Sequence, residues 1–171
     1  MNTTGNADDL PATHRLALVG IPWDENSSFL HGPSEAPPLI RAALFSDASG
    51  LRSESGIEFR AGDIFDAGDV PMRSGVAMSN EIEDFIGNLL EQNFRPISLG
   101  GDHAVTHPIV KAFARKYPDL SILQFDAHPD LYDIYQGNRC SHACPFARIM
   151  DANFREIAKK DPDLKTLQTL L

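Results

Sequence analysis

The stretch Leu120–Asp133, LSILQFDAHPDLYD, concentrates the polar chemistry of this sequence. Its first part, Ser121–Phe125, is an apolar run without internal Gly or Pro, which predicts a strand buried on both faces. The run ends in Asp126-Ala-His-Pro-Asp130, where polar side chains recur at every second position. Such side chains point the same way in an extended chain, and the proline disfavours helix before it. The stretch therefore predicts two carboxylates and an imidazole gathered at a strand end.

Nitrogen and oxygen ligands of this kind suit Mn, Fe, Ni or Zn better than Ca or Mg. The motif alone also has a structural interpretation, because an Asp at a strand end often caps a turn and a single His is often an ordinary polar residue. A second cluster favours the metal interpretation: the apolar run Ile97–Leu99 is followed by Gly100-Gly-Asp-His103. Sites in parallel sheets form outside the carboxyl ends of the strands, so the two clusters are expected to meet.

The two clusters together resemble the ureohydrolase family, which includes arginases, agmatinases and their relatives. The metal motifs of that family read G-G-D-H and D-A-H-x-D, and both occur here in the same order. The segment Gly137–Met150, GNRCSHACPFARIM, looks most like the agmatinase branch. The likeness runs from about Leu16 to about Met150. It implies an arginase-like α/β fold, with three αβα layers around a mostly parallel sheet.

The resemblance makes His103 and Asp130 ligands of one metal ion, His128 a ligand of a second and Asp126 a bridge between them. It implies two Mn²⁺ ions in a complete site, or other divalent ions in their place. A metal-bridging hydroxide would then attack the carbon of a guanidinium group, because bound metals lower the pKa of water. His142 matches the family histidine that moves protons or contacts substrate, and imidazole titrates near neutral pH. The implied enzyme is an agmatinase-like ureohydrolase, a C–N hydrolase of linear amidines, which converts agmatine to putrescine and urea.

Two residues depart from the family pattern. Arginases carry an amide two residues after the last carboxylate of the second motif, where it helps hold the amino-acid end of the substrate; this chain has Tyr132 there. The departure favours agmatine or another small cationic guanidino compound over arginine. Ala104 stands where the family usually has Ser after G-G-D-H, and the lost hydroxyl is expected to loosen His103.

The family domain continues with an Asp-x-Asp pair that completes both metals and later with a Glu that grips the guanidinium. Nothing after Met150 matches either, which predicts a domain truncated after about four strands. Two dications about 3.5 Å apart repel by roughly 20 kcal/mol at an effective dielectric of about 20. With only two carboxylates against that charge, one weakly held metal is the expectation. Two alternatives stay open: a non-catalytic remnant that acts through metal or protein binding, and a mononuclear hydrolase such as a deacetylase.

The sequence divides into a flexible N-terminus (1–14), an N-terminal part of the α/β domain (15–150) and a helical tail without a clear family match (151–171). We predict strands at 15–21, 56–64, 95–99 and 121–125. We predict helices at 39–45, opened by prolines, and at 79–92, capped by Ser79, with a further helix capped by Thr106. Residues 66–71 are predicted to form a turn. Asp161-Pro-Asp163 echoes the missing pair but follows no strand.

Composition excludes several classes of protein. A net charge of −9 and a pI near 5.0 in 171 residues argue against binding to nucleic acid or to an anionic membrane. Residues 1–14 do not resemble a signal peptide, so the chain is expected to be cytoplasmic. The family resemblance implies a homo-oligomer. The two cysteines, Cys140 and Cys144, fall short of the four ligands of a structural zinc site and are interpreted as free thiols.

Overall fold

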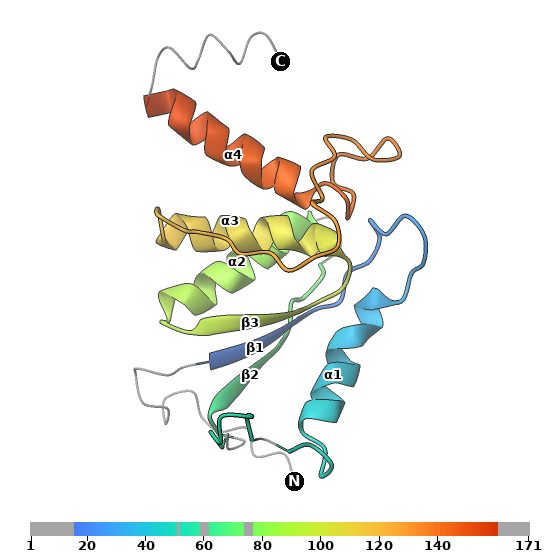
Figure 1. Cartoon of the computed structure of the whole chain (residues 1–171), viewed down its shortest axis with the longest axis vertical. Coiled ribbons are helices and arrows are strands. Elements are labelled where there is room, and N and C mark those ends of the chain that lie inside the picture. Colours follow the sequence, from blue (N-terminus) through green and yellow to red (C-terminus); the bar gives the residue numbers. More distant parts are fainter. Residues whose placement is uncertain (1–15, 51, 59–61, 74–76, 161–171) are drawn as a thin grey trace.

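The computed structural model describes residues 16–50, 52–58, 62–73 and 77–160, with the backbone alone for 153–160 (Figure 1). The predicted flexible N-terminus, the Asp161-Pro-Asp163 echo and the last part of the predicted tail lie outside the described residues. The elements follow one another as β1 (Leu16–Ile21), η2 (Pro33–Glu35), α1 (Ala36–Leu44), β2 (Ile64–Asp69), α2 (Met78–Glu91), β3 (Arg95–Gly100), η3 (His103–Val105), α3 (Thr106–Lys116) and α4 (Pro145–Lys160). None of the helices in this described part is long and apolar enough to cross a membrane.

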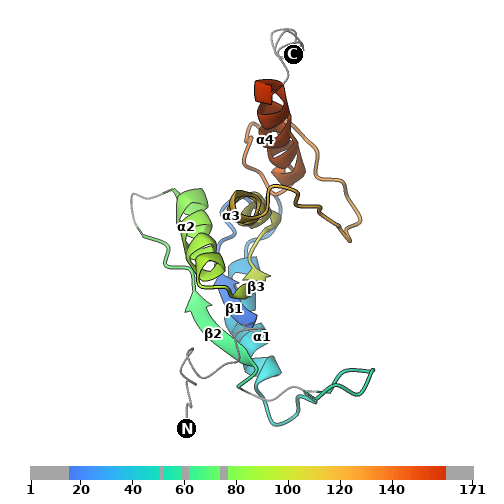
Figure 2. The same ribbon diagram turned by 90° about the vertical axis from the view of Figure 1, so that its left-hand side faces the viewer.

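The centre of the fold is a parallel sheet in the order β2-β1-β3. Helix α1 covers one face of the sheet, while α2 and α3 lie on the other, with α4 beyond α3 (Figure 2). Alternate residues of β1 point to opposite faces. Ala17, Val19 and Ile21 face the core on the α2 side, where Ile82, Ile86 and Leu90 of α2 pack against them. Every residue from Ala17 to Ile21 is buried, as expected for a central parallel strand.

Charged side chains hold α2 to α3 and to the segment that follows β2. Glu83 is 3% exposed on α2 and pairs with Lys111 of α3 at 2.7 Å and with Arg115 of the same helix. Glu81, equally buried, accepts a hydrogen bond of 2.7 Å from Arg73. Burial of such carboxylates is tolerated because each one is paired.

The strand predicted at 56–64 is wrong in its described part: β2 begins at Ile64 and includes residues 66–69 of the predicted turn. Gly56 instead lies in a turn, with φ of 84° and its amide donating to the Ser53 carbonyl. Asp66 and Asp69 fit in a strand because Arg41 of α1 pairs with both, at 3.0 Å in the case of Asp66. Gly68, with φ of 78°, lies opposite the register shift between Leu18 and Gly20. The turn-like composition therefore marks a β-bulge.

The predicted fourth strand at 121–125 is also wrong: this segment is irregular and runs past α3 (Figure 1). An extended segment becomes a strand only where a neighbour accepts and donates its backbone hydrogen bonds. Among the described residues β3 pairs with β1 alone, and no strand lies beside 121–125. Leu123 and Phe125 consequently remain 79% and 92% exposed.

The predicted element boundaries agree with the structure better than the predicted N-cap residues do. The strand predicted at 95–99 and the helix predicted at 79–92 are confirmed within one residue as β3 and α2. Helix α1 starts earlier than predicted, with prolines in its first turn. The N-cap of α2 is Ala77 and that of α3 is Val105, neither with a side-chain hydrogen bond, so the predicted caps Ser79 and Thr106 are wrong.

Candidate metal centre

The turn after β3 depends on a close approach between two backbones. A Cβ atom added to Gly101 would lie 1.7 Å from the carbonyl oxygen of Trp23, so only glycine fits there. The same carbonyl accepts a hydrogen bond of 2.8 Å from the Asp102 amide. The glycine pair therefore allows the sharp turn expected from the sequence and ties the end of β3 to the loop after β1.

Asp102 organises this turn from inside the protein. Its side chain is 5% exposed and accepts hydrogen bonds from the backbone amides of Ala104 at 2.8 Å and of Asn26 at 2.9 Å. Burial raises the pKa of the Asp102 carboxyl, and the two amides act in the opposite direction. Asp102 caps the short helix η3, which begins with His103.

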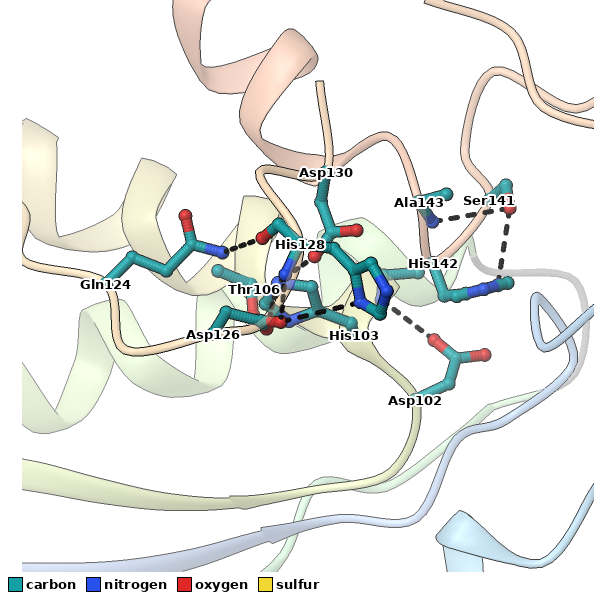
Figure 3. A network of polar contacts seen from close by, with 11 residues as sticks. Asp102, His103, Thr106, Gln124, Asp126, His128, Asp130, Ser141, His142 and Ala143 are labelled. Carbon is teal, nitrogen blue, oxygen red and sulfur yellow. Dashed lines mark hydrogen bonds and ion pairs between the residues drawn. The ribbon is translucent and has the colours of Figure 1, made fainter. Parts of the chain in front are cut away.

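The ring of His103 lies between a hydroxyl group and two carboxylates. Its Nδ1 atom lies 3.0 Å from Oγ1 of Thr106. Its Nε2 atom lies 3.1 Å from Oδ2 of Asp130 and 3.8 Å from Oδ2 of Asp126. This Nε2 atom is buried and has no hydrogen-bond partner within the described ranges. The three side chains converge as shown in Figure 3.

The two carboxylates belong to one loop and are held differently. Oδ1 of Asp126 accepts a hydrogen bond of 3.0 Å from the His128 amide, which lowers the pKa of Asp126 and leaves Oδ2 near His103. Asp130 has a left-handed backbone, with φ of 47°, and its side chain is 12% exposed. Its carbonyl accepts a hydrogen bond from the Phe146 amide at the start of α4. Strained backbone of this kind is common at functional sites.

These residues fit a metal ion. One ligand atom each of His103, Asp126 and Asp130 lies within 4.8 Å of the other two, and no other group of this kind occurs in the part of the chain that the structure describes. A buried imidazole nitrogen without a hydrogen bond, facing two carboxylate oxygens, is a donor set that suits a divalent transition metal. The hydroxyl of Thr106 can accept the proton of Nδ1, which would direct Nε2 to the metal.

Of the four ligands predicted from the sequence, three come together and His128 does not join them. Its side chain is 80% exposed, and its Nδ1 atom lies 3.9 Å from Oδ1 of Asp126. The role of His128 as a ligand therefore stays a prediction.

His142 lies beside an open depression of about 630 Å³, which adjoins the three-residue cluster. The depression is lined by His128, Pro129, Asp130, Leu131, Tyr132, Tyr135, His142 and Ala143. Nδ1 of His142 lies 3.0 Å from the Asn26 carbonyl oxygen, and Nε2 lies 3.4 Å from Oγ of Ser28. The ring of Tyr135 meets the imidazole edge-on, with centroids 5.8 Å apart. The predicted proton-transfer residue is thus placed next to the candidate metal centre.

The two remaining histidines of the described residues and the two cysteines do not belong to the three-residue cluster. The side chain of His31 is 67% exposed, 3.5 Å from Asp24. His107 lies in the first turn of α3, and burial lowers its pKa. Cys140 and Cys144 are free, as predicted, the first exposed and the second buried.

Sequence reasoning missed two residues of this site, Asn26 and Asp102, and misjudged Thr106. Asn26 lies in the loop after β1, and nothing in its sequence context pointed to the site. Asp102 was visible within G-G-D-H, and an Asp before a short helix is a capping signal. Thr106 was predicted to be a cap, but its hydroxyl contacts Nδ1 of His103.

The fold and the sequence both have known relatives. The sequence profile of the Arginase family matches residues 14–160. Arginase 1 of Arabidopsis thaliana, named as mitochondrial, is 40% identical over 148 residues, which is 81% of this chain and 43% of that protein. The agmatinase of Bacillus cereus is 37% identical over 142 residues, which is 80% of this chain and 48% of that protein.

Solved structures show the same likeness. The arginase of Medicago truncatula superposes with a TM-score of 0.75 and 36% identity, covering 85% of this chain and 54% of that one. A putative agmatinase of Clostridium difficile gives a TM-score of 0.73 at 28% identity, with 80% and 50% covered. The chain thus spans about half the length of the relatives that it matches. With this arginase-like α/β fold and the profile match over most of its length, the chain belongs to the Arginase family of ureohydrolases.

Proposed function

We propose that this chain carries out, or forms part of, the metal-dependent hydrolysis of a guanidino compound, with agmatine as the preferred substrate. The observation that supports this most is the convergence of His103, Asp126 and Asp130 at the end of β3. Membership of the Arginase family gives the reaction class. The products would be urea and an amine.

Each site residue has a proposed role. Nε2 of His103 and the carboxylates of Asp126 and Asp130 hold the metal, and His128 adds a ligand from the same loop. Manganese, when bound, supplies a water molecule of lowered pKa that is nucleophilic at neutral pH. His142 moves a proton between this site and the leaving amine, since it lines the same depression as Asp130. The carboxylates also attract the cationic guanidinium group.

The number of metal ions follows from charge. Within the described ranges the cluster contains two carboxylates, and two dications need more negative charge than this to offset their mutual repulsion. We therefore propose one Mn²⁺ per chain when the chain is studied alone. A complete family site would hold two.

The preference for agmatine rests on Tyr132. Its side chain is 59% exposed at the depression, and its ring lies 5.3 Å from that of Tyr135. These tyrosine rings offer no amide group to hold a substrate carboxylate. Arginine has such a carboxylate and agmatine does not. Arginine is the natural competitor, because the chain is similar to both arginases and agmatinases.

The test is urea release by the purified chain, with and without Mn²⁺, from agmatine and from arginine. We expect Mn²⁺-dependent urea from agmatine in excess of that from arginine, and loss of both in His128→Ala. Absence of urea with either substrate would contradict a catalytic role for the chain alone. More urea from arginine would overturn the assignment of agmatine while leaving the reaction class.

A second candidate function is protein binding without catalysis. It is favoured by the apolar side chains exposed along one loop, where Leu123, Phe125 and Leu131 are 79%, 92% and 54% exposed. Patches of this kind mark interaction surfaces in soluble proteins. The occupant that we propose is a second copy of this chain, as expected for a family-like homo-oligomer. Light scattering of the purified chain tests this: a dimer that Phe125→Asp dissociates supports it, and a monomer contradicts it.

A further inference from the structure

We infer that His142 works as the Nδ1–H tautomer, with Nε2 as its proton-transfer atom, and that Asn26 and Asp102 are the residues that position it. The catalytic part of this inference rests on the proposed function. The tautomer and its supports are properties of the chain itself and can be measured without any activity.

The tautomer follows from what Nδ1 faces. It lies 3.0 Å from the carbonyl oxygen of Asn26, and a carbonyl oxygen can only accept a hydrogen bond. Oγ of Ser141 lies farther from Nδ1, at 3.4 Å, and a hydroxyl can accept as well as donate. The shorter contact, with the carbonyl, therefore places the proton on Nδ1. The backbone amide of His142 approaches the same carbonyl at 3.3 Å, which adds a second constraint on the residue.

The opposite nitrogen is then free to act as a base. In the neutral ring with a proton on Nδ1, Nε2 carries the lone pair. It lies 3.4 Å from Oγ of Ser28, whose hydroxyl can donate to it. The ring of Tyr135 packs against the imidazole at an interplanar angle of 80° and limits its rotation. His142, with the lone pair on Nε2, thus lines the depression shared with Asp130.

Asn26 can orient His142 because it is itself anchored at two points. Its backbone amide donates to Oδ2 of Asp102 at 2.9 Å, and its side-chain Oδ1 accepts from Nδ2 of Asn138 at 2.9 Å. Asp102 is buried, so this hydrogen bond is shielded from water. Asn138 lies in the loop that leads to His142, so Asn26 is also anchored to the segment that contains His142.

The same carboxylate also sets the turn that contains His103. Oδ1 of Asp102 accepts from the Ala104 amide at 2.8 Å, while Oδ2 accepts from Asn26. One buried side chain therefore fixes both the metal-ligand turn and the loop that orients His142. Asp102 touches neither the proposed metal nor the substrate, so its role is to position residues that do.

The tautomer is tested by nitrogen NMR of the full chain labelled with ¹⁵N-histidine, at about two pH units above the ordinary histidine pKa of about 6.5. His142→Gln assigns the signal. We expect a single tautomer with a protonated Nδ1 and an unprotonated Nε2. If Nε2 carries the proton in the unaltered chain, the inference is wrong, and no substitution is needed to show it.

The positioning roles are tested by Asp102→Asn and by Asn138→Ala. Asp102→Asn replaces one acceptor by an NH₂ group, so one of its two amide contacts is lost, and Asn138→Ala removes the other anchor of Asn26. We expect both to lose the single-tautomer signature of His142, whereas Asp47→Asn, at an exposed loop position, retains it. An unchanged spectrum in both variants contradicts the assignment; if Asp102→Asn does not fold, Asn138→Ala decides.

The inference and the proposed function can fail separately. An Nδ1–H tautomer in a chain that releases no urea contradicts the function alone. Urea release from a chain whose His142 carries its proton on Nε2 contradicts the inference alone.

Discussion

The Nε2 atom of His103, at the start of η3, lies 3.1 Å from Oδ2 of Asp130, in the loop that precedes α4. The nitrogen is buried, without a hydrogen-bond partner among the described residues, and a second carboxylate oxygen lies 3.8 Å away on Asp126. In the tautomer that donates Nδ1–H to Thr106, the lone pair of Nε2 faces the negative charge of the carboxylates and gains little from them. A divalent cation between them would attract the nitrogen lone pair and both carboxylate oxygens.

Thr106→Val tests the orientation of His103. The hydroxyl lies 3.0 Å from Nδ1, and the substitution removes it with little change in shape. We expect the affinity for Mn²⁺, measured by calorimetry, to fall by about 10- to 100-fold, the usual cost of removing a group that orients a metal ligand. Thr106→Ser keeps the hydroxyl and should restore most of the affinity. Equal affinities for the valine and serine variants would show that the hydroxyl has no such role.

Gly101→Ala tests the close approach that forms the turn. The new Cβ atom would lie 1.7 Å from the Trp23 carbonyl oxygen, so the end of β3 and the loop after β1 must separate. We expect a large drop in the free energy of unfolding, measured by urea denaturation, beyond the 0.5–3 kcal/mol that is typical of single substitutions. The matched control is Gly87→Ala in α2, where no atom lies within 4 Å of the added Cβ. It should stabilise the chain by about 0.5–1 kcal/mol; similar effects at both glycines would contradict the account of the turn.

Ile86→Ala tests the core between α2 and β1. Ile86 is fully buried, and its truncation leaves a cavity among Val19, Ile82 and their neighbours. The expected loss of unfolding free energy is about 2–5 kcal/mol. Leu39→Ala in α1, 66% exposed, is the control and should change stability by less than about 0.5 kcal/mol. A small effect at Ile86 would mean that α2 does not pack on the sheet in solution.

The loop after β1 should respond to acid through Asp24. A hydrogen bond from the Gly32 amide, at 2.6 Å, lowers the pKa of Asp24 from 3.8 to about 2. Because the pKa is lower in the folded chain, the stabilisation is fully present above about pH 4 and is lost as the pH falls towards 2. The free energy of unfolding of the unaltered chain and of Asp24→Asn can be measured by urea denaturation at several pH values. The difference between the two free energies should shrink as the pH falls over this range. If this difference stays constant down to pH 2, Asp24 is not the source of the response to acid.

The sequence predicted the parts of the fold that depend on local pattern. The apolar run of β1 and the amphipathic stripe of α2 lie within one or two residues of their predicted positions, since burial follows periodicity. The acidic strand β2 was missed because Asp66 and Asp69 are stabilised by Arg41, a partner that no local pattern reveals. The run at 121–125 was predicted to be a strand because its composition is right, but a strand also needs a neighbour.

The candidate site shows the same division. His103, Asp126 and Asp130 were predicted from two short motifs at element ends, and the structure brings them together. His128 has the right spacing, yet the left-handed backbone of Asp130 shows that the loop is not a regular extended strand, so alternation does not hold there. Asp102 acts through its carboxylate, which accepts from the Asn26 backbone amide, and Asn26 acts through its carbonyl oxygen, which faces Nδ1 of His142. Both contacts join residues that are far apart in sequence, so they appear only once the chain is folded.

The most direct measurement is Mn²⁺ binding to the purified chain, by calorimetry and by the electron paramagnetic resonance signal of free Mn²⁺. The three-residue cluster predicts saturable binding of one Mn²⁺ per chain, weakened by more than about 10-fold in Asp130→Asn and unchanged in Asp47→Asn. Equal affinities of the unaltered chain and Asp130→Asn, or no saturable binding at all, would contradict the claim that these side chains form a metal centre.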